Sequence, residues 1–182
     1  MEQTQTRART RRREYTWADP AATVAVLGSR PGLDVLRAMV AGELPPPPVA
    51  SMLGFVVEAV DVGRAAFVLE PDEWHYNPLG TVHGGVIATL LDSAAGCAVH
   101  SLLPAGAGYT TVDLHTTFLR PVTAATGRIT AEGTVLSRGS RTALAEARLC
   151  DGQGRLLAHA TSTCLILDLT HPTGDGAGPA AR

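Results

Sequence analysis

One acidic residue interrupts a long apolar segment of the chain. Asp92 lies in the middle of residues 83–99, where Val, Ile, Leu and Ala dominate. An ionised carboxylate in such surroundings is costly to desolvate unless it is paired or used. Asp92 is therefore a candidate general base or nucleophile. The structural alternative is an acid satisfied by neighbouring hydroxyl groups or by a partner helix.

Two adjacent glycines, Gly84 and Gly85, stand at the start of the same segment. At the beginning of a helix they would leave backbone N–H groups accessible at the positive end of the helix dipole. Such a site suits a carbonyl oxygen that gains negative charge during a reaction. The alternative is structural, because glycines also permit a tight turn or close packing of a helix on a strand.

The spacing between these two groups has a consequence for assembly. Asp92 follows Gly84 by eight residues. A rise of ~1.5 Å per residue then separates them by ~12 Å along a helix, too far to act on one carbon atom. Two antiparallel helices related by a two-fold axis would bring the carboxylate of one chain to the helix start of the other. If both groups are catalytic, the spacing predicts a homodimer with two identical sites.

A metal centre is less well supported by the same part of the chain. His75, His83 and Asp92 are possible zinc ligands, but no motif such as His-Glu-x-x-His accompanies them. Taken alone, His83 is more typical of a structural histidine that hydrogen-bonds a loop. We expect no metal ion at this site.

Composition narrows the class of protein. The 182 residues, 45% of them hydrophobic, suffice for one domain with a substantial core. The net charge of −2 provides no basic field for a nucleic acid. No uninterrupted apolar run reaches the ~18 residues of a membrane span, so we expect no membrane partner. Three cysteines without metal-type spacing indicate reduced thiols and a cytoplasmic protein.

The elements around Asp92 follow from hydrophobic periodicity. The apolar spacing in residues 33–40 predicts a short helix, which the proline run at 45–48 must end. After the helix at 84–99, alternation predicts strands in which Thr111 shares a face with Asp113, His115 and Thr117. The expected strands are residues 54–60 and 65–70 as a hairpin, then 111–118, 128–135, 143–149 and 155–167. This order predicts an α+β fold, an antiparallel sheet wrapped around one long central helix.

Several short motifs are specific in combination. They are Asn77–Gly85 (NPLGTVHGG), Leu91–Ser93, Thr110–Leu114, Phe118–Pro121 and Ser137–Gly139. Together they resemble the PaaI-like branch of the hotdog-fold acyl-CoA thioesterases, from about residue 53 to 167. The resemblance implies a hotdog fold, with an extra N-terminal helix here, and protomers that pair into dimers and again into homotetramers. It implies no cofactor, because coenzyme A would be part of the substrate and product.

The resemblance also implies roles for individual residues. Asp92 would be the nucleophile or general base, Gly84 the oxyanion donor, and Asn77 and His83 the groups that orient the carbonyl, the water and the loop. Thr111 would help to hold the attacking water. Three arginines, Arg120, Arg138 and Arg141, would meet the phosphates of coenzyme A, with a solvated surface role as the equal alternative.

The function expected from these residues is hydrolysis of an aryl or medium-chain acyl-CoA to a free acid and coenzyme A. A non-catalytic acyl-CoA sensor on the same fold is the alternative, followed by a hydratase or dehydratase that would recruit His83. The expected layout is a disordered Arg-rich tail over 1–30, a helix and Pro-rich connector over 31–52, the thioesterase domain over 53–168 and a flexible tail over 169–182.

Overall fold

The strands form one continuous antiparallel sheet. A computed structural model of the chain describes residues 9–170. Within them the sheet has six strands in the order β1-β2-β4-β5-β6-β3. The strands are β1 (Val56–Asp61), β2 (Arg64–Leu69), β3 (Ala107–Phe118), β4 (Ile129–Arg138), β5 (Thr142–Asp151) and β6 (Leu156–Asp168). Short 3₁₀ turns, η1 (Glu73–His75) and η2 (Ala124–Thr126), lie in the connections.

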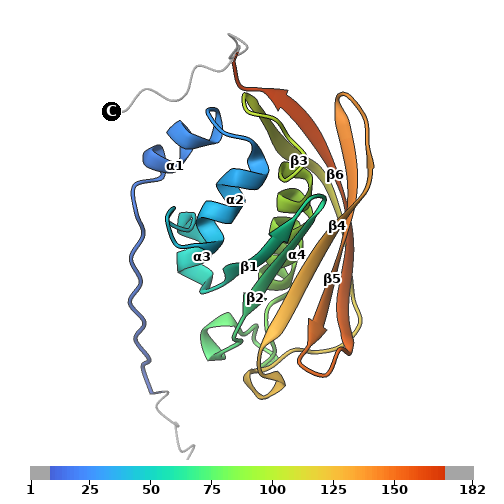
Figure 1. The fold of residues 1–182 in the computed structure, drawn as a ribbon. Coiled ribbons are helices and arrows are strands. Elements are labelled where there is room, and N and C mark those ends of the chain that lie inside the picture. The colour runs from blue at the N-terminus through green and yellow to red at the C-terminus, as the bar shows by residue number, and fades with distance from the viewer. Residues whose placement is uncertain (1–8, 171–182) are drawn as a thin grey trace, which may run out of the picture.

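Helix α4 (Gly84–His100) is the main hydrophobic partner of this sheet. Its residues Leu90, Leu91, Ala94 and Ala98 are fully buried in a core shared with β2, β4, β5 and β6. The closest approach is at Gly133 of β4, where a Cβ atom would lie 2.1 Å from the carbonyl oxygen of Ala94. Figure 1 shows the strands curving around this helix, as the sequence predicts.

Three shorter helices precede the sheet and cover another side of the molecule. They are α1 (Pro20–Leu27), α2 (Gly32–Val40) and α3 (Pro48–Leu53). Figure 1 shows them grouped beside β1 and α4, away from β5 and β6. Val35 and Leu36 of α2 are buried, and Gly32 lies so close to α4 that a Cβ atom there would meet the carbonyl oxygen of His100 at 1.9 Å.

The main elements agree with the sequence analysis, and three details differ. The helix expected over residues 33–40, the hairpin, the central helix and the later strands are all present. Helix α1 lies inside the stretch expected to be disordered. Pro48 begins helix α3 instead of ending an extended connector, because proline is well tolerated at the first helical position. The third difference is a β-bulge in β3, described below. Residues 1–8 of the expected N-terminal tail and 171–182 of the expected C-terminal tail lie outside the described residues.

No helix in residues 9–170 has the length and apolar character needed to cross a membrane.

Candidate active site

Asp92 is joined to the neighbouring strand by a hydrogen bond. The hydroxyl of Thr111, on β3, donates to Oδ1 of Asp92 at 2.8 Å. Both residues are half-buried, so the carboxylate is accessible rather than fully enclosed. The hydrogen bond fixes one carboxylate oxygen and leaves Oδ2 without a hydrogen-bond partner among residues 9–170, so that it can accept a proton or attack.

A bulge in β3 explains how Thr111 reaches Asp92. Thr111 pairs with Cys164 and Asp113 with Thr163, so that Val112 is the extra residue. A bulge shifts the alternation of side chains by one position. Thr111 therefore faces α4, as Leu114 does, and does not share the face of Asp113, as strict alternation predicts. The expected grouping of Thr111 with Asp113, His115 and Thr117 is wrong for this reason.

The start of α4 presents one open amide. His83 is the N-cap, and its Nδ1 accepts a hydrogen bond from the Gly85 amide at 2.9 Å. Gly84 is the first helical residue, and no acceptor for its N–H lies in the described part of the chain. The sequence analysis expected the amides of both Gly84 and Gly85 to be open, but only the Gly84 amide is. A Cβ atom at Gly84 would approach the ring of Phe118 to 3.1 Å, which favours glycine at this position.

Asn77 organises the loop that precedes this helix. Its Oδ1 accepts hydrogen bonds from the amides of Leu79 (2.9 Å) and Thr81 (3.3 Å), and its Nδ2 donates to the Thr81 hydroxyl at 3.0 Å. An amide NH₂ has two protons, so one remains for a ligand. The backbone of His83 is also fixed, because its N–H donates to the carbonyl of His75 at 2.7 Å.

The predicted site residues lie in two separate cavities of one chain. Asn77, Gly84, Phe118 and Arg120 line a cavity of about 390 Å³ at the start of α4. Asp92 lines a different and more apolar cavity of about 540 Å³, bounded by the N-terminal helices. The structure therefore brings Asp92 together with Thr111, and Asn77 together with Gly84, but it does not bring these two pairs together within one chain.

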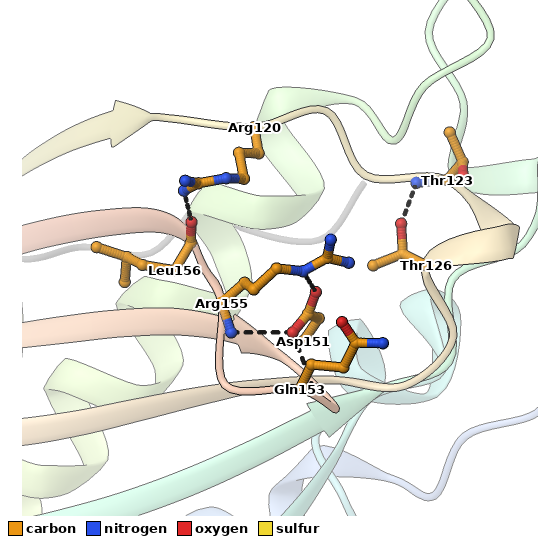
Figure 2. A network of polar contacts seen from close by, with 7 residues as sticks. All are labelled: Arg120, Thr123, Thr126, Asp151, Gln153, Arg155 and Leu156. Carbon is orange, nitrogen blue, oxygen red and sulfur yellow. Dashed lines mark hydrogen bonds and ion pairs between the residues drawn. The ribbon is translucent and has the colours of Figure 1, made fainter.

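Arg120 is already engaged with the chain itself. Its side chain donates a hydrogen bond to the carbonyl of Leu156, the first residue of β6. Figure 2 shows this contact beside the ion pair of Arg155 with Asp151. Arg120 is exposed and lines the Gly84 cavity, and its guanidinium group has further N–H donors. They are still available to an anion.

The other two arginines lie at the opposite end of the sheet. Arg138 on β4 pairs with β5, which pairs with β6 and so with β3, and this places Arg138 in register with Thr111 across the sheet. Arg141 belongs to the turn that follows β4. Phe118, which touches the Gly84 position, lies seven residues further along β3, a distance of ~20 Å in an extended strand. In one chain, Arg138 and Arg141 are thus at the level of Asp92, and Arg120 is at the level of Gly84.

Three titratable groups near Asp92 were not predicted as site residues from the sequence. Burial raises the pKa of the Cys97 thiol to about 12, although a hydrogen bond with Tyr109 opposes the shift. Burial likewise raises the pKa of Tyr109 and lowers the pKa of His100. All three line the Asp92 cavity. The signal in the sequence is that Asp92, Cys97 and His100 fall on one side of a helix with 3.6 residues per turn.

The zinc alternative finds no support in this geometry. Among residues 9–170, no three His, Cys, Asp or Glu side chains gather as a metal site would require. His75 is buried and committed to the fold, since its Nδ1 accepts from the Asp72 amide at 3.0 Å and its Nε2 lies 2.7 Å from the carbonyl oxygen of Leu53.

Comparison with known proteins identifies the family. Residues 79–158 match the thioesterase superfamily. The chain is 33% identical to a provisionally named thioesterase, a phenylacetic acid degradation-related protein of Ralstonia eutropha JMP134; the superposition covers 71% of this chain and 98% of that one, with a TM-score of 0.65. The PaaI protein of Escherichia coli shares the fold, with a TM-score of 0.65, 22% identity and coverage of 72% and 93%.

A curated relative aligns with a shorter stretch of the chain. A Halobacterium salinarum protein provisionally named an esterase is 45% identical over 69 residues, which are 37% of this chain and 44% of that protein. The chain thus spans less than half the length of this relative. With the family match and the structural superpositions, these findings show that the chain belongs to the thioesterase superfamily and has its hotdog fold.

Proposed function

We propose that the protein hydrolyses an acyl-CoA thioester to a free acid and coenzyme A, with Asp92 as base or nucleophile. The observation that carries this proposal is the carboxylate of Asp92, held by Thr111 at 2.8 Å on the wall of an apolar cavity. Such a cavity suits an acyl group, and a carboxylate at its wall suits attack on the acyl carbonyl.

The chemistry requires few groups. A thiolate leaves readily, so a strong general acid is dispensable. Either Asp92 takes a proton from water as the water attacks the carbonyl carbon, or its carboxylate attacks directly and water then cleaves the anhydride. In both routes the C–S bond breaks and the thiolate takes up a proton. The net reaction is thioester plus water to acid plus thiol.

The Gly84 amide supplies the oxyanion site in this proposal. Its N–H stands at the positive end of α4 and has no acceptor in the described part of the chain. Asn77 would use its remaining amide proton on the carbonyl or the water. His83 would fix the helix start through its hydrogen bond with Gly85.

The site is proposed to form between two protomers. Asp92 and Gly84 open into different cavities, and the hydrogen-bonding edge of β3 has no strand beside it among residues 9–170. A strand of 12 residues with a free edge is a template for pairing with a second copy. An antiparallel pair of β3 strands would carry Asp92 of one protomer toward Gly84 of the other, and two such dimers would form the homotetramer.

The same pairing gives the three arginines a common role. In one chain, Arg120 lies at the Gly84 end of the sheet, and Arg138 and Arg141 lie at the Asp92 end. An antiparallel dimer superimposes these two ends. The three side chains would then surround one entrance and could contact the phosphates of coenzyme A.

A thiol-release assay over a panel of acyl-CoAs tests this function. We expect turnover by the parent and a loss of at least 100-fold, on the order of one catalytic group, in Asp92→Asn and Asp92→Ala. Glu70→Gln, an exposed acid outside both cavities, is the matched control and should keep full activity. Hydrolysis that survives both Asp92 substitutions removes this carboxylate from the mechanism. Tight binding without turnover in the parent would instead support an acyl-CoA sensor.

A further inference from the structure

The N-terminal helices and the connection between α2 and α3 form one side of the cavity beside Asp92. Met39 of α2 and Ala50 of α3 line it, together with Pro46 between them and Phe55 just after α3. Its volume of about 540 Å³ lies in the range of small-molecule sites. Among the described residues, Asp92 is the only acidic side chain on its wall, and neither Arg nor Lys lines it.

His100 is a buried polar side chain that lines this cavity. It is 5% exposed, and neither of its ring nitrogens has a hydrogen-bond partner within residues 9–170. A buried donor or acceptor without a partner is destabilising, so a native structure normally satisfies it with water or a ligand. Burial lowers the pKa of His100, so the ring is neutral at pH 7 and offers one donor and one acceptor.

The positions of Asp92 and His100 define a path along α4. They are eight residues apart, which is ~12 Å along the helix axis, and both line the same cavity. An extended polypeptide backbone spans ~3.5 Å per residue over three bonds, which is ~1.2 Å per bond. An extended acyl chain advances by about the same length per bond. About ten bonds therefore separate a carbonyl at Asp92 from a group at His100.

We propose that this cavity binds the acyl chain of the substrate and that His100 selects acyl chains with a hydroxyl group about ten bonds from the thioester carbon. This inference rests on the proposed function, since it assigns the substrate class of the same site. A hydroxyl is both donor and acceptor and matches a neutral imidazole. A terminal carboxylate does not fit, because no cation lines the cavity in the described part of the chain.

The assignment also divides the dimeric site between its two protomers. Asp92 and His100 belong to one chain, so the acyl chain would lie inside the protomer that supplies the carboxylate. The partner would supply the oxyanion amide and the entrance for coenzyme A.

Kinetics with matched substrates test the selection. For the parent, kcat/KM should be about tenfold higher with 10-hydroxydecanoyl-CoA than with decanoyl-CoA, the upper end of the effect of one neutral hydrogen bond. His100→Leu should abolish this ratio by accepting decanoyl-CoA better. Tyr109→Phe is the matched control, because the Tyr109 hydroxyl already has Cys97 as its partner. In that variant the ratio should persist.

Direct binding to the parent separates this inference from the proposed function. Calorimetric titration with alkane-1,ω-diols and the corresponding 1-alkanols of eight to twelve carbons needs neither turnover nor a folded variant. At least tenfold tighter binding of a diol in this series supports the inference, even if neither acyl-CoA is hydrolysed and the proposed function fails. Equal binding at every length, or no binding, overturns the assignment of His100. Acyl-CoA hydrolysis with no hydroxyl preference overturns the inference alone.

Discussion

The hydroxyl of Thr111 donates a 2.8 Å hydrogen bond to Oδ1 of Asp92. This contact joins the central helix to the edge strand of the sheet where Asp92 lines the apolar cavity. It exists because the bulge at Val112 turns Thr111 toward α4. The position of the carboxylate therefore depends on strand β3 as well as on its own helix.

Removing this hydroxyl tests that dependence. Thr111→Val keeps the shape of the side chain but leaves Asp92 without its donor, and we expect kcat/KM to fall by about tenfold, the worth of one hydrogen bond to a charged group at its lower end. Thr111→Ser keeps the hydroxyl and should retain most of the activity. Equal activity of the valine and serine variants in the thiol-release assay would show that the hydrogen bond has no part in the reaction.

The Gly84 amide can be tested without deleting the helix start. Gly84 is the first helical residue, where proline is favoured, and His83 before it has φ −60° and ψ 135°, which a following proline accepts. Gly84→Pro removes the N–H and should lower kcat by about 100-fold or more. Gly84→Ala meets the same Phe118 ring but keeps the N–H, so it serves as the control. Similar losses in both variants would assign the effect to packing instead.

The general architecture was predictable because it depends on local patterns. Periodicity along residues 84–99 and alternation in the later strands fix one long helix and several half-buried strands, and these have few ways to pack. Asp92 stood out because a charge in an apolar helix is rare, and its distance from Gly84 follows from helix geometry alone. Helix α1 was missed, since eight residues without an amphipathic pattern give little signal.

Features that depend on tertiary pairing could not be predicted from the sequence. The bulge at Val112 arises from the register of β3 against β6, and one inserted residue reverses the face of Thr111. The cavity around His100 requires α2 and α3 to fold back over α4, which no local pattern states. The sequence also could not show that His83 uses the Gly85 amide and leaves only that of Gly84 open.

Close packing of α4 on the sheet predicts a strong effect at Gly133. A Cβ atom there would lie 2.1 Å from the backbone of Ala94, so Gly133→Ala forces the helix away from β4. We expect the free energy of unfolding to fall by about 3 kcal/mol, the upper end of overpacking penalties, as measured by urea denaturation. Gly152→Ala, whose Cβ atom would meet nothing within 4 Å, should change stability little. Comparable stability of the two variants would contradict the described helix–sheet contact.

The turn between β5 and β6 predicts a dependence of stability on acid pH. Burial would raise the pKa of Asp151, but hydrogen bonds from Arg155 and from the Gln153 amide, with the charge of Arg155, hold it below its usual value of 3.8 (Figure 2). The unfolded chain then binds this proton more readily than the folded chain. The stabilisation is present above pH 3.8 and is lost as the pH falls below it.

Asp151→Asn should therefore flatten the pH dependence of the unfolding free energy below about pH 4. It should also lower stability at pH 7, where the ion pair with Arg155 is intact in the parent. Denaturation curves over this pH range give the comparison, with Asp61→Asn, an exposed acid at the end of β1, as the control. A variant as steeply acid-sensitive as the parent would show that Asp151 does not carry this linkage.

The most direct measurement concerns the site shared between two protomers. Asp92→Asn and Gly84→Pro are each expected to be nearly inactive, but a mixed dimer of the two contains one site with both groups intact. Coexpression of differently tagged chains should restore about a quarter of the parent's activity, because half of random dimers are mixed and one of their two sites is complete. Purification of the mixed dimer should raise this to about half. Mixed dimers as inactive as the single variants would contradict a site built from two chains.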